Sequence, residues 1–232
     1  RPFYNPANMF LCIAGNVDAD AVLEQVDRTL GDQPSQKVIR GLHDEPREIN
    51  KSFVEQRLSV AQPMFNLGFK EACDTPEKSL KNRIATSVLL EIISGKSSPL
   101  YERLINMSLV NENFSAEYFN GFGYATEIFD GESSDPERVA AEIKAEIKRL
   151  RTDGIGADDF MRAKNSLYGQ MVMQYNVIDN VASALVGAAM SGDGLFDELE
   201  VFNSLTVDDI EQCLRDQLHE EYSALSVIRP AE

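Results

Sequence analysis

The sequence predicts an α+β fold, with helices packed against a mixed or antiparallel sheet. Strand-like segments follow one another without an intervening helix, at residues 53–60 and 64–70 and again at 113–120 and 122–129, around Gly121. Strands that are neighbours in this way tend to pair antiparallel. The segments between and after them carry apolar residues at helical spacing, which is typical of helices that cover a sheet.

The chain is expected to open with a strand and a helix. Residues 9–14 are a short apolar run, which is typical of a buried strand. Asp18 can cap the helix that follows, and Gly31 ends it. Residues 32–51 are polar and lack a sustained period, so we interpret them as a linker and place the domain boundary there.

The later elements are predicted from caps, prolines and apolar stripes. Helices are expected to open at Thr75 with Pro76, at Pro99, at Asp135 with Pro136, at Ala157, and at Thr206 with Asp209. The stretch 157–191 is long enough for two helices divided near 176–180, and a last strand is expected at 224–228. We interpret four methionines as core residues and not as a binding groove. They are Met161, Met171, Met173 and Met190.

The charge balance excludes partners with a strongly negative surface. The 232 residues include 38 acidic and 22 basic side chains, for a formal net charge of -16. Proteins that bind nucleic-acid backbones or anionic lipid headgroups do so through clustered Lys and Arg. We therefore expect no nucleic-acid partner and no membrane partner.

The cysteines and the apolar runs indicate a compartment. Three well-separated cysteines suggest buried free thiols in a reducing environment and no disulfide framework. No apolar run reaches the roughly 20 residues that cross a bilayer. We expect a cytoplasmic protein, and because the sequence starts at Arg1 and not at Met we expect it to be a fragment of a longer one.

No catalytic or metal motif is present in the sequence. A hydrolytic zinc site typically has two histidines one helical turn apart, whereas the two histidines here, His43 and His219, lie far apart in the sequence. We interpret His219 as a surface residue near a helix end. An enzyme of another class, acting through Cys73, stays open as an alternative.

Several segments together resemble one family. Residues 3–9 and 15–18, with the sequences FYNPANM and GNVD, are similar to the start of the C-terminal region of insulinase-type (pitrilysin, M16) zinc peptidases. The predicted helix after them and the segment 95–101, GKSSPLY, are similar to later parts of the same region. The resemblance extends in order and spacing over most of the chain.

The resemblance implies one half of an enzyme. Members are built from repeated α+β domains, each a mixed, largely antiparallel sheet with helices packed on one side, and two halves enclose a chamber that holds an unfolded peptide. Residues 1–50 then correspond to the terminal strand and helix of a preceding repeat plus a linker, and residues 51–232 to a complete C-terminal domain. Zinc is expected in an N-terminal half that carries an HxxEH motif, with no cofactor in this chain.

The same resemblance implies partners and site residues. The expected partners are the zinc-bearing N-terminal half, on the same polypeptide or on a partner subunit, and a peptide substrate. The family often holds substrate with an Arg and a Tyr seven residues apart, but Ile105 and Glu112 stand at those positions here. As candidate substrate contacts the sequence offers Phe114 and Tyr118, which share one face of a strand, although both also suit core packing.

Two functional hypotheses follow. In the first, the chain is the non-zinc half of an M16-type metallopeptidase, inactive alone, and forms one wall of the chamber. Its negative charge would favour basic peptides. In the second, the chain is part of a non-catalytic pseudo-peptidase that acts as a scaffold or interaction subunit.

Overall fold

The chain divides into two compact units. The computed structural model describes residues 4–30, 38–39, 41, 45–72, 78–194 and 196–231. One unit comprises residues 1–41 and 168–200, and the other comprises residues 42–167 and 201–232. All buried apolar side chains among the described residues belong to the second unit. The second unit therefore contains the hydrophobic core.

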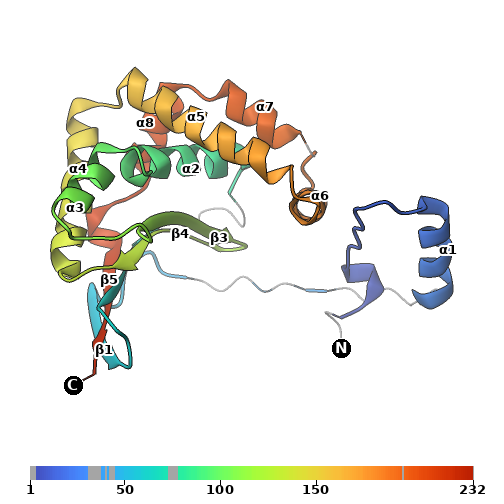
Figure 1. Cartoon of the computed structure of the whole chain (residues 1–232), viewed down its shortest axis with the longest axis horizontal. Helices are drawn as coiled ribbons and strands as arrows, with labels where there is room; N and C mark the ends of the chain where they lie inside the picture. Colours follow the sequence, from blue (N-terminus) through green and yellow to red (C-terminus); the bar gives the residue numbers. More distant parts are fainter. Residues whose placement is uncertain are drawn as a thin grey trace. The chain divides into compact units, whose positions relative to one another are not determined.

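A five-stranded sheet lies in the second unit, in the order β1-β5-β2-β4-β3 (Figure 1). The strands are β1 (Phe53–Leu58), β2 (Met64–Lys70), β3 (Ser115–Gly121), β4 (Tyr124–Glu132) and β5 (Ser223–Pro230). β1 pairs with β5 in parallel, and the other three pairings are antiparallel. The predicted mixed, largely antiparallel sheet is thus confirmed.

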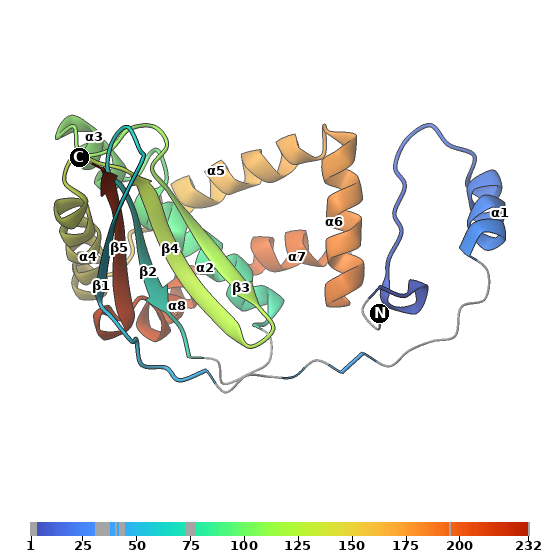
Figure 2. The same ribbon diagram turned by 90° about the horizontal axis from the view of Figure 1, so that it is seen from below.

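Helices cover one face of this sheet (Figure 2). α2 (Leu80–Ser94) packs on β3, α4 (Pro136–Asp153) packs on β2 and β5, and α8 (Val207–Asp216) packs on α2. Because α2 has the sheet on one side and α8 on the other, nine of its fifteen residues are buried. The side chains of Phe65, Leu67 and Phe69 on β2, and of Phe129 on β4, form the core beneath the helices.

Capping side chains explain where several helices begin. Asp18 accepts hydrogen bonds from the backbone at the start of α1 (Ala19–Leu30), and Asp135 does the same for α4. Thr206 and Asp209 form a complete capping box on α8. Ser98 caps α3 (Pro99–Asn106). These starts agree with the sequence predictions.

The long helical stretch is divided as predicted, into α5 (Ala157–Gln174) and α6 (Ile178–Ser191). α7 (Asp197–Ser204) was not predicted. It buries only Phe202, so its sequence shows no apolar stripe. No helix among the described residues is long and apolar enough to cross a membrane.

The prediction of a strand at residues 9–14 is wrong. The segment has no strand conformation, and Phe10 and Leu11 are about 60% exposed. A strand needs a neighbour to satisfy its backbone hydrogen bonds. Within the described part of the chain, the segment pairs with no strand of the sheet.

The interpretation of the methionines as core residues is also wrong. Met161, Met173 and Met190 are between 52% and 69% exposed, and Met171 is half-buried. Helical spacing places side chains on a common stripe, but it does not show that another element covers the stripe. For α6, no residue is buried.

Smaller differences concern where elements begin and end. Thr75 and Pro76 lie outside the described residues, and α2 as described begins at Leu80, capped by Ser79. Gly121 is the last residue of β3 and not the turn itself. The turn uses Gly123, whose φ of 84° lies in the left-handed region that favours glycine.

Candidate functional site

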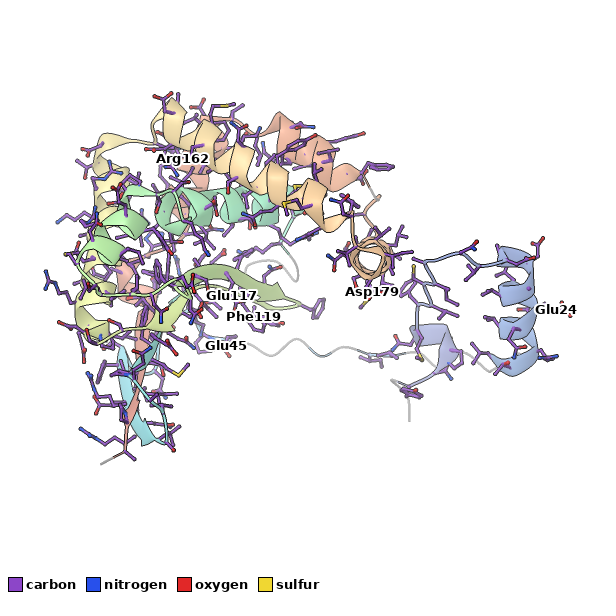
Figure 3. The ribbon with its side chains drawn as sticks, in the orientation of Figure 1. Glu24, Glu45, Glu117, Phe119, Arg162 and Asp179 are labelled. Atoms are coloured by element: carbon purple, nitrogen blue, oxygen red, sulfur yellow. The ribbon has the colours of Figure 1, made fainter. Side chains whose placement is uncertain are left out.

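The sheet face opposite the helices is open. Along β3 the side chains of Ser115, Glu117 and Phe119 are exposed, whereas those between them are half-buried. The register places these three opposite Asp130, Ile128 and Thr126 of β4, so all six share one face. Figure 3 shows Glu117 and Phe119 extending from β3 on the side away from α2.

The charged groups of the open face are mainly acidic, and apolar side chains such as Met64 and Ile128 lie among them. Glu117, Asp130 and Glu132 point from it, and the Ser115 hydroxyl donates to Asp130 at 2.8 Å. One lysine of the face, Lys70, is neutralised by an ion pair with Glu45. A face with this balance attracts positive charge.

An aromatic pair lies at the end of the β3–β4 hairpin. The rings of Phe119 and Tyr124 have centroids 5.3 Å apart, and both side chains are exposed, Phe119 by 53%. Exposed aromatic rings beside an acidic strand face can pack on the aliphatic part of a basic or apolar side chain.

The candidate residues Phe114 and Tyr118 lie on the helix side. The Phe114 ring is buried and stacks with Phe65 and with Tyr101, each at 6.3 Å between centroids. The Tyr118 hydroxyl donates to Asn82 of α2 at 3.3 Å. The two share one face as predicted; Phe114 packs in the core and Tyr118 is half-buried at its edge. Their role in substrate contact stays a prediction.

Sequence reasoning missed a buried polar cluster beneath Tyr118. The carboxyl group of Glu127 is fully buried, and Glu71 lies beside it. The Gln217 amide donates to Glu71 and to Thr86, at 3.1 and 3.0 Å. A glutamate at an inward position of an alternating strand, between Ala125 and Phe129, was the available signal.

Burial changes the acidity of several groups in this cluster. Burial raises the pKa of the Cys213 thiol to about 12, and the Sγ donates to the Gln217 side chain at 2.7 Å. Burial and a hydrogen bond with Glu71 raise the pKa of the Tyr118 hydroxyl. These groups stay protonated near neutral pH and cannot serve as nucleophiles there.

Residues of other types stand at the two positions where the family often has the Arg and Tyr that hold substrate. Ile105, on α3, is 37% exposed, and Glu112 is exposed ahead of β3. The neighbouring arginine, Arg103, is not available in their place, because it binds Glu142 and Glu146 of α4, each at 3.1 Å. At the two positions that the resemblance assigns to the pair, the chain therefore has no arginine and no tyrosine to hold a substrate backbone.

The residues that the structure describes do not form a zinc site. Among the described residues, no three His, Cys, Asp or Glu side chains gather as metal ligands. His219 lies beside Glu221, with 3.9 Å between Nδ1 and the carboxylate. Cys213 is a buried free thiol and Cys12 a half-buried one, while His43 and Cys73 lie outside the described residues.

Comparison with known proteins assigns the chain to a family. The sequence profile described as "Peptidase M16 inactive domain" matches residues 1–167. The chain belongs to the M16 peptidase family. It is 25% identical over 221 residues to the uncharacterised zinc protease YmfH of Bacillus subtilis and 24% identical over 218 residues to an uncharacterised zinc protease of Rickettsia felis.

Solved M16 structures share the fold. An M16-like peptidase from Alicyclobacillus acidocaldarius has a TM-score of 0.84 and 22% identity, covering 94% of this chain and 53% of that one. The peptidase M16 inactive domain from Pseudomonas fluorescens has a TM-score of 0.70 and 15% identity, covering 92% of this chain and 50% of that one.

The chain spans about half the length of the curated relatives that it matches. The match to the Bacillus subtilis protein covers 93% of this chain and 51% of that protein. The match to the Rickettsia felis protein covers 89% of this chain and 50% of that protein. The division of this M16 chain at residue 50, into the end of one repeat and one complete domain, stays a prediction.

Proposed function

We propose that this chain is the non-zinc, C-terminal half of an M16 zinc metallopeptidase and that the open face of its sheet forms one wall of the peptide chamber. The observation that carries the proposal is the match to the M16 inactive domain, in a chain half the length of relatives named zinc proteases. Zinc and its general base would come from the other half.

The open face is the surface best suited to an enclosed peptide. The opposite face is filled by α2, α4 and α8, whereas this one presents acidic, hydroxyl and aromatic groups. An unfolded peptide offers backbone amides and side chains of every kind. A sheet face that presents polar, apolar and aromatic side chains can contact such a peptide without demanding one sequence.

Exposed apolar side chains in the first unit support a further partner. Its helices α1 and α6 bury no residue, although Leu23, Ile178 and Met190 are apolar and more than half exposed. Helices of 12 and 14 residues gain most of their stability from packing. We infer that these apolar faces are covered by the zinc-bearing half, on the same polypeptide or on a partner subunit.

A cytoplasmic location is part of the proposal. Its support is the cysteine pattern of the sequence, because three well-separated cysteines give no disulfide framework of the kind that is common in oxidising compartments. To test this location, peptide hydrolysis is measured in cell fractions and the protein is fused to a reporter. The activity should be in the cytosolic fraction, and the reporter should not reach the periplasm.

The first experiment compares this chain with the longer polypeptide of its gene. The chain alone should bind no stoichiometric zinc and hydrolyse no unfolded peptide, and the longer polypeptide should contain an HxxEH motif, bind one zinc and hydrolyse the peptide. Turnover by the chain alone would contradict the proposal. A longer polypeptide without zinc or turnover would instead establish the scaffold function.

The second experiment maps the chamber wall. A photo-crosslinking amino acid replaces Glu117 on the open face of the longer polypeptide, and a matched variant carries it at Gln212, which is exposed on α8. Crosslinks to a bound peptide are expected at position 117 only. Equal or stronger crosslinking at position 212 would show that the substrate contacts the helical side.

A further inference from the structure

Glu127 is an acidic group in an apolar setting. It lies on β4 between Ala125 and Phe129, faces the helices, and is 0% exposed. No donor group of another described residue is hydrogen-bonded to either carboxyl oxygen. A buried carboxylate without donors is very unfavourable, so such a group ordinarily keeps its proton.

The neighbour that Glu127 does have is a second carboxyl group. Glu71, just beyond β2, interacts with Glu127 through the side chains. Glu71 is ion-paired with Lys78 at 2.7 Å and accepts from Gln217 at 3.1 Å. These donors stabilise the negative charge on Glu71. Two carboxyl groups can hydrogen-bond to each other only when one carries a proton, and the missing donors assign that proton to Glu127.

The groups around Glu127 come from each element packed on it. Glu71 follows β2, Lys78 precedes α2, Tyr118 is on β3 and Cys213 is on α8. Burial, followed by the hydrogen bond with Glu71 and its charge, raises the pKa of Glu127 well above the usual range, against smaller opposite effects of its own backbone N–H and of Lys78. With the proton in place, Glu71 and Lys78 balance each other and the site is neutral.

We propose that Glu71 and Glu127 form a proton-dependent lock between the sheet and helices α2 and α8. The folded domain holds one proton on Glu127, which donates to Glu71. When rising pH removes this proton, two carboxylates remain in a site with one lysine, and the packing of β3 and β4 against α2 and α8 opens. The lock regulates the fold and is independent of the proposed chamber function.

The direction of the effect follows from proton linkage. The folded domain binds a proton that an opened, hydrated Glu127 releases near its ordinary pKa of about 4.3. Stability from this proton is therefore complete below about pH 4 and is lost as the pH rises towards the pKa of the folded domain. One linked proton changes the opening equilibrium constant by about tenfold per pH unit in that interval.

Alkylation of Cys213 measures the opening, because its thiol is buried within the cluster. The rate at Cys213 is followed by peptide mass spectrometry between pH 5 and 9, in the wild type and in Glu127→Gln, which keeps the shape and stays neutral. The ratio of the two rates cancels the intrinsic reactivity of the thiol. It should rise by up to about tenfold per pH unit. The ratio of the wild-type rate to the rate of Glu117→Gln, a substitution on the open face of β3, should stay constant over the same pH range.

Two results would overturn the lock. One is a ratio of wild type to Glu127→Gln that stays constant across this pH range. The other comes from infrared spectra in D2O at pH 7, where the wild type should show a carboxylic-acid C=O band that Glu127→Gln lacks; absence of the band would mean that Glu127 is ionised. If the variant fails to fold, the wild-type rate divided by that of the denatured chain gives the same test.

Discussion

Replacing Glu146 by glutamine tests what holds α3 on α4. The carboxylate of Glu146 is 4% exposed and accepts from Arg103 of α3 at 3.1 Å and from Arg149 at 2.7 Å. Burial raises the pKa of Glu146, but the hydrogen bonds from the two arginines outweigh burial and hold it below its usual range. The substitution removes the charge and keeps the size.

The expected loss follows from the exposure of the partners. Breaking a fully buried ion pair costs about 3–5 kcal/mol, but the side chains of Arg103 and Arg149 are 39% and 43% exposed, so water continues to solvate them. A hydrogen bond to a charged group contributes roughly 1.5–3 kcal/mol, and the glutamine oxygen keeps part of it. We expect a loss of about 2 kcal/mol in the free energy of unfolding.

Urea unfolding at several pH values measures this loss. Because the folded pKa of Glu146 is depressed, its contribution is present above about pH 4.3 and disappears as the pH falls through the folded pKa. Glu142→Gln is the matched control, since Glu142 contacts the same arginine but is 28% exposed, and it should cost about 0.5 kcal/mol. Equal losses for the two variants, or a Glu146→Gln loss that does not shrink in acid, would refute the reasoning.

Three further predictions concern a cap, a turn and the open face. Thr206→Ala removes the capping box of α8 and should cost about 1 kcal/mol in urea unfolding; no change would deny the cap a stabilising role. Gly123→Ala forces an alanine to φ 84° and should cost about 1 kcal/mol; an unchanged midpoint would contradict this. In the longer polypeptide that the proposed function requires, Glu117→Lys with Asp130→Lys should raise KM for basic peptides severalfold and lower it for acidic ones, more strongly at low salt; a preference insensitive to these changes would show that peptides do not contact this face.

Local chemistry predicted most of the helices in the second unit. Asp135 followed by proline, and Thr206 with Asp209, each mark a helix start through hydrogen bonds that involve only a few neighbouring residues. The parallel pairing of β1 with β5 joins residues about 170 positions apart. No local pattern encodes that contact, so the sequence indicated a mixed sheet without giving the strand order.

The candidate site was predicted less well, for a related reason. Alternation correctly placed Phe114 and Tyr118 on one side of a strand, but a period of two does not tell which side the helices cover. The exposed residues Ser115 and Glu117 of β3 lie between them in sequence and are on the open face instead. The same alternation contained Glu127 at an inward position, where a carboxyl group signals a special site.

The separation of these two faces explains how an M16 domain can change its surface groups and keep its fold. The core side chains, such as Phe65, Leu67 and Phe129, point toward the helices and are buried. Zinc ligands or substrate-binding groups would be attached to the same scaffold without replacing any of them. Loss of such groups therefore leaves packing intact, which agrees with TM-scores of 0.84 and 0.70 at 22% and 15% identity. In the proposed function, substrate preference would depend on the charges of the open face, such as Glu117 and Asp130, which can change without altering these core side chains.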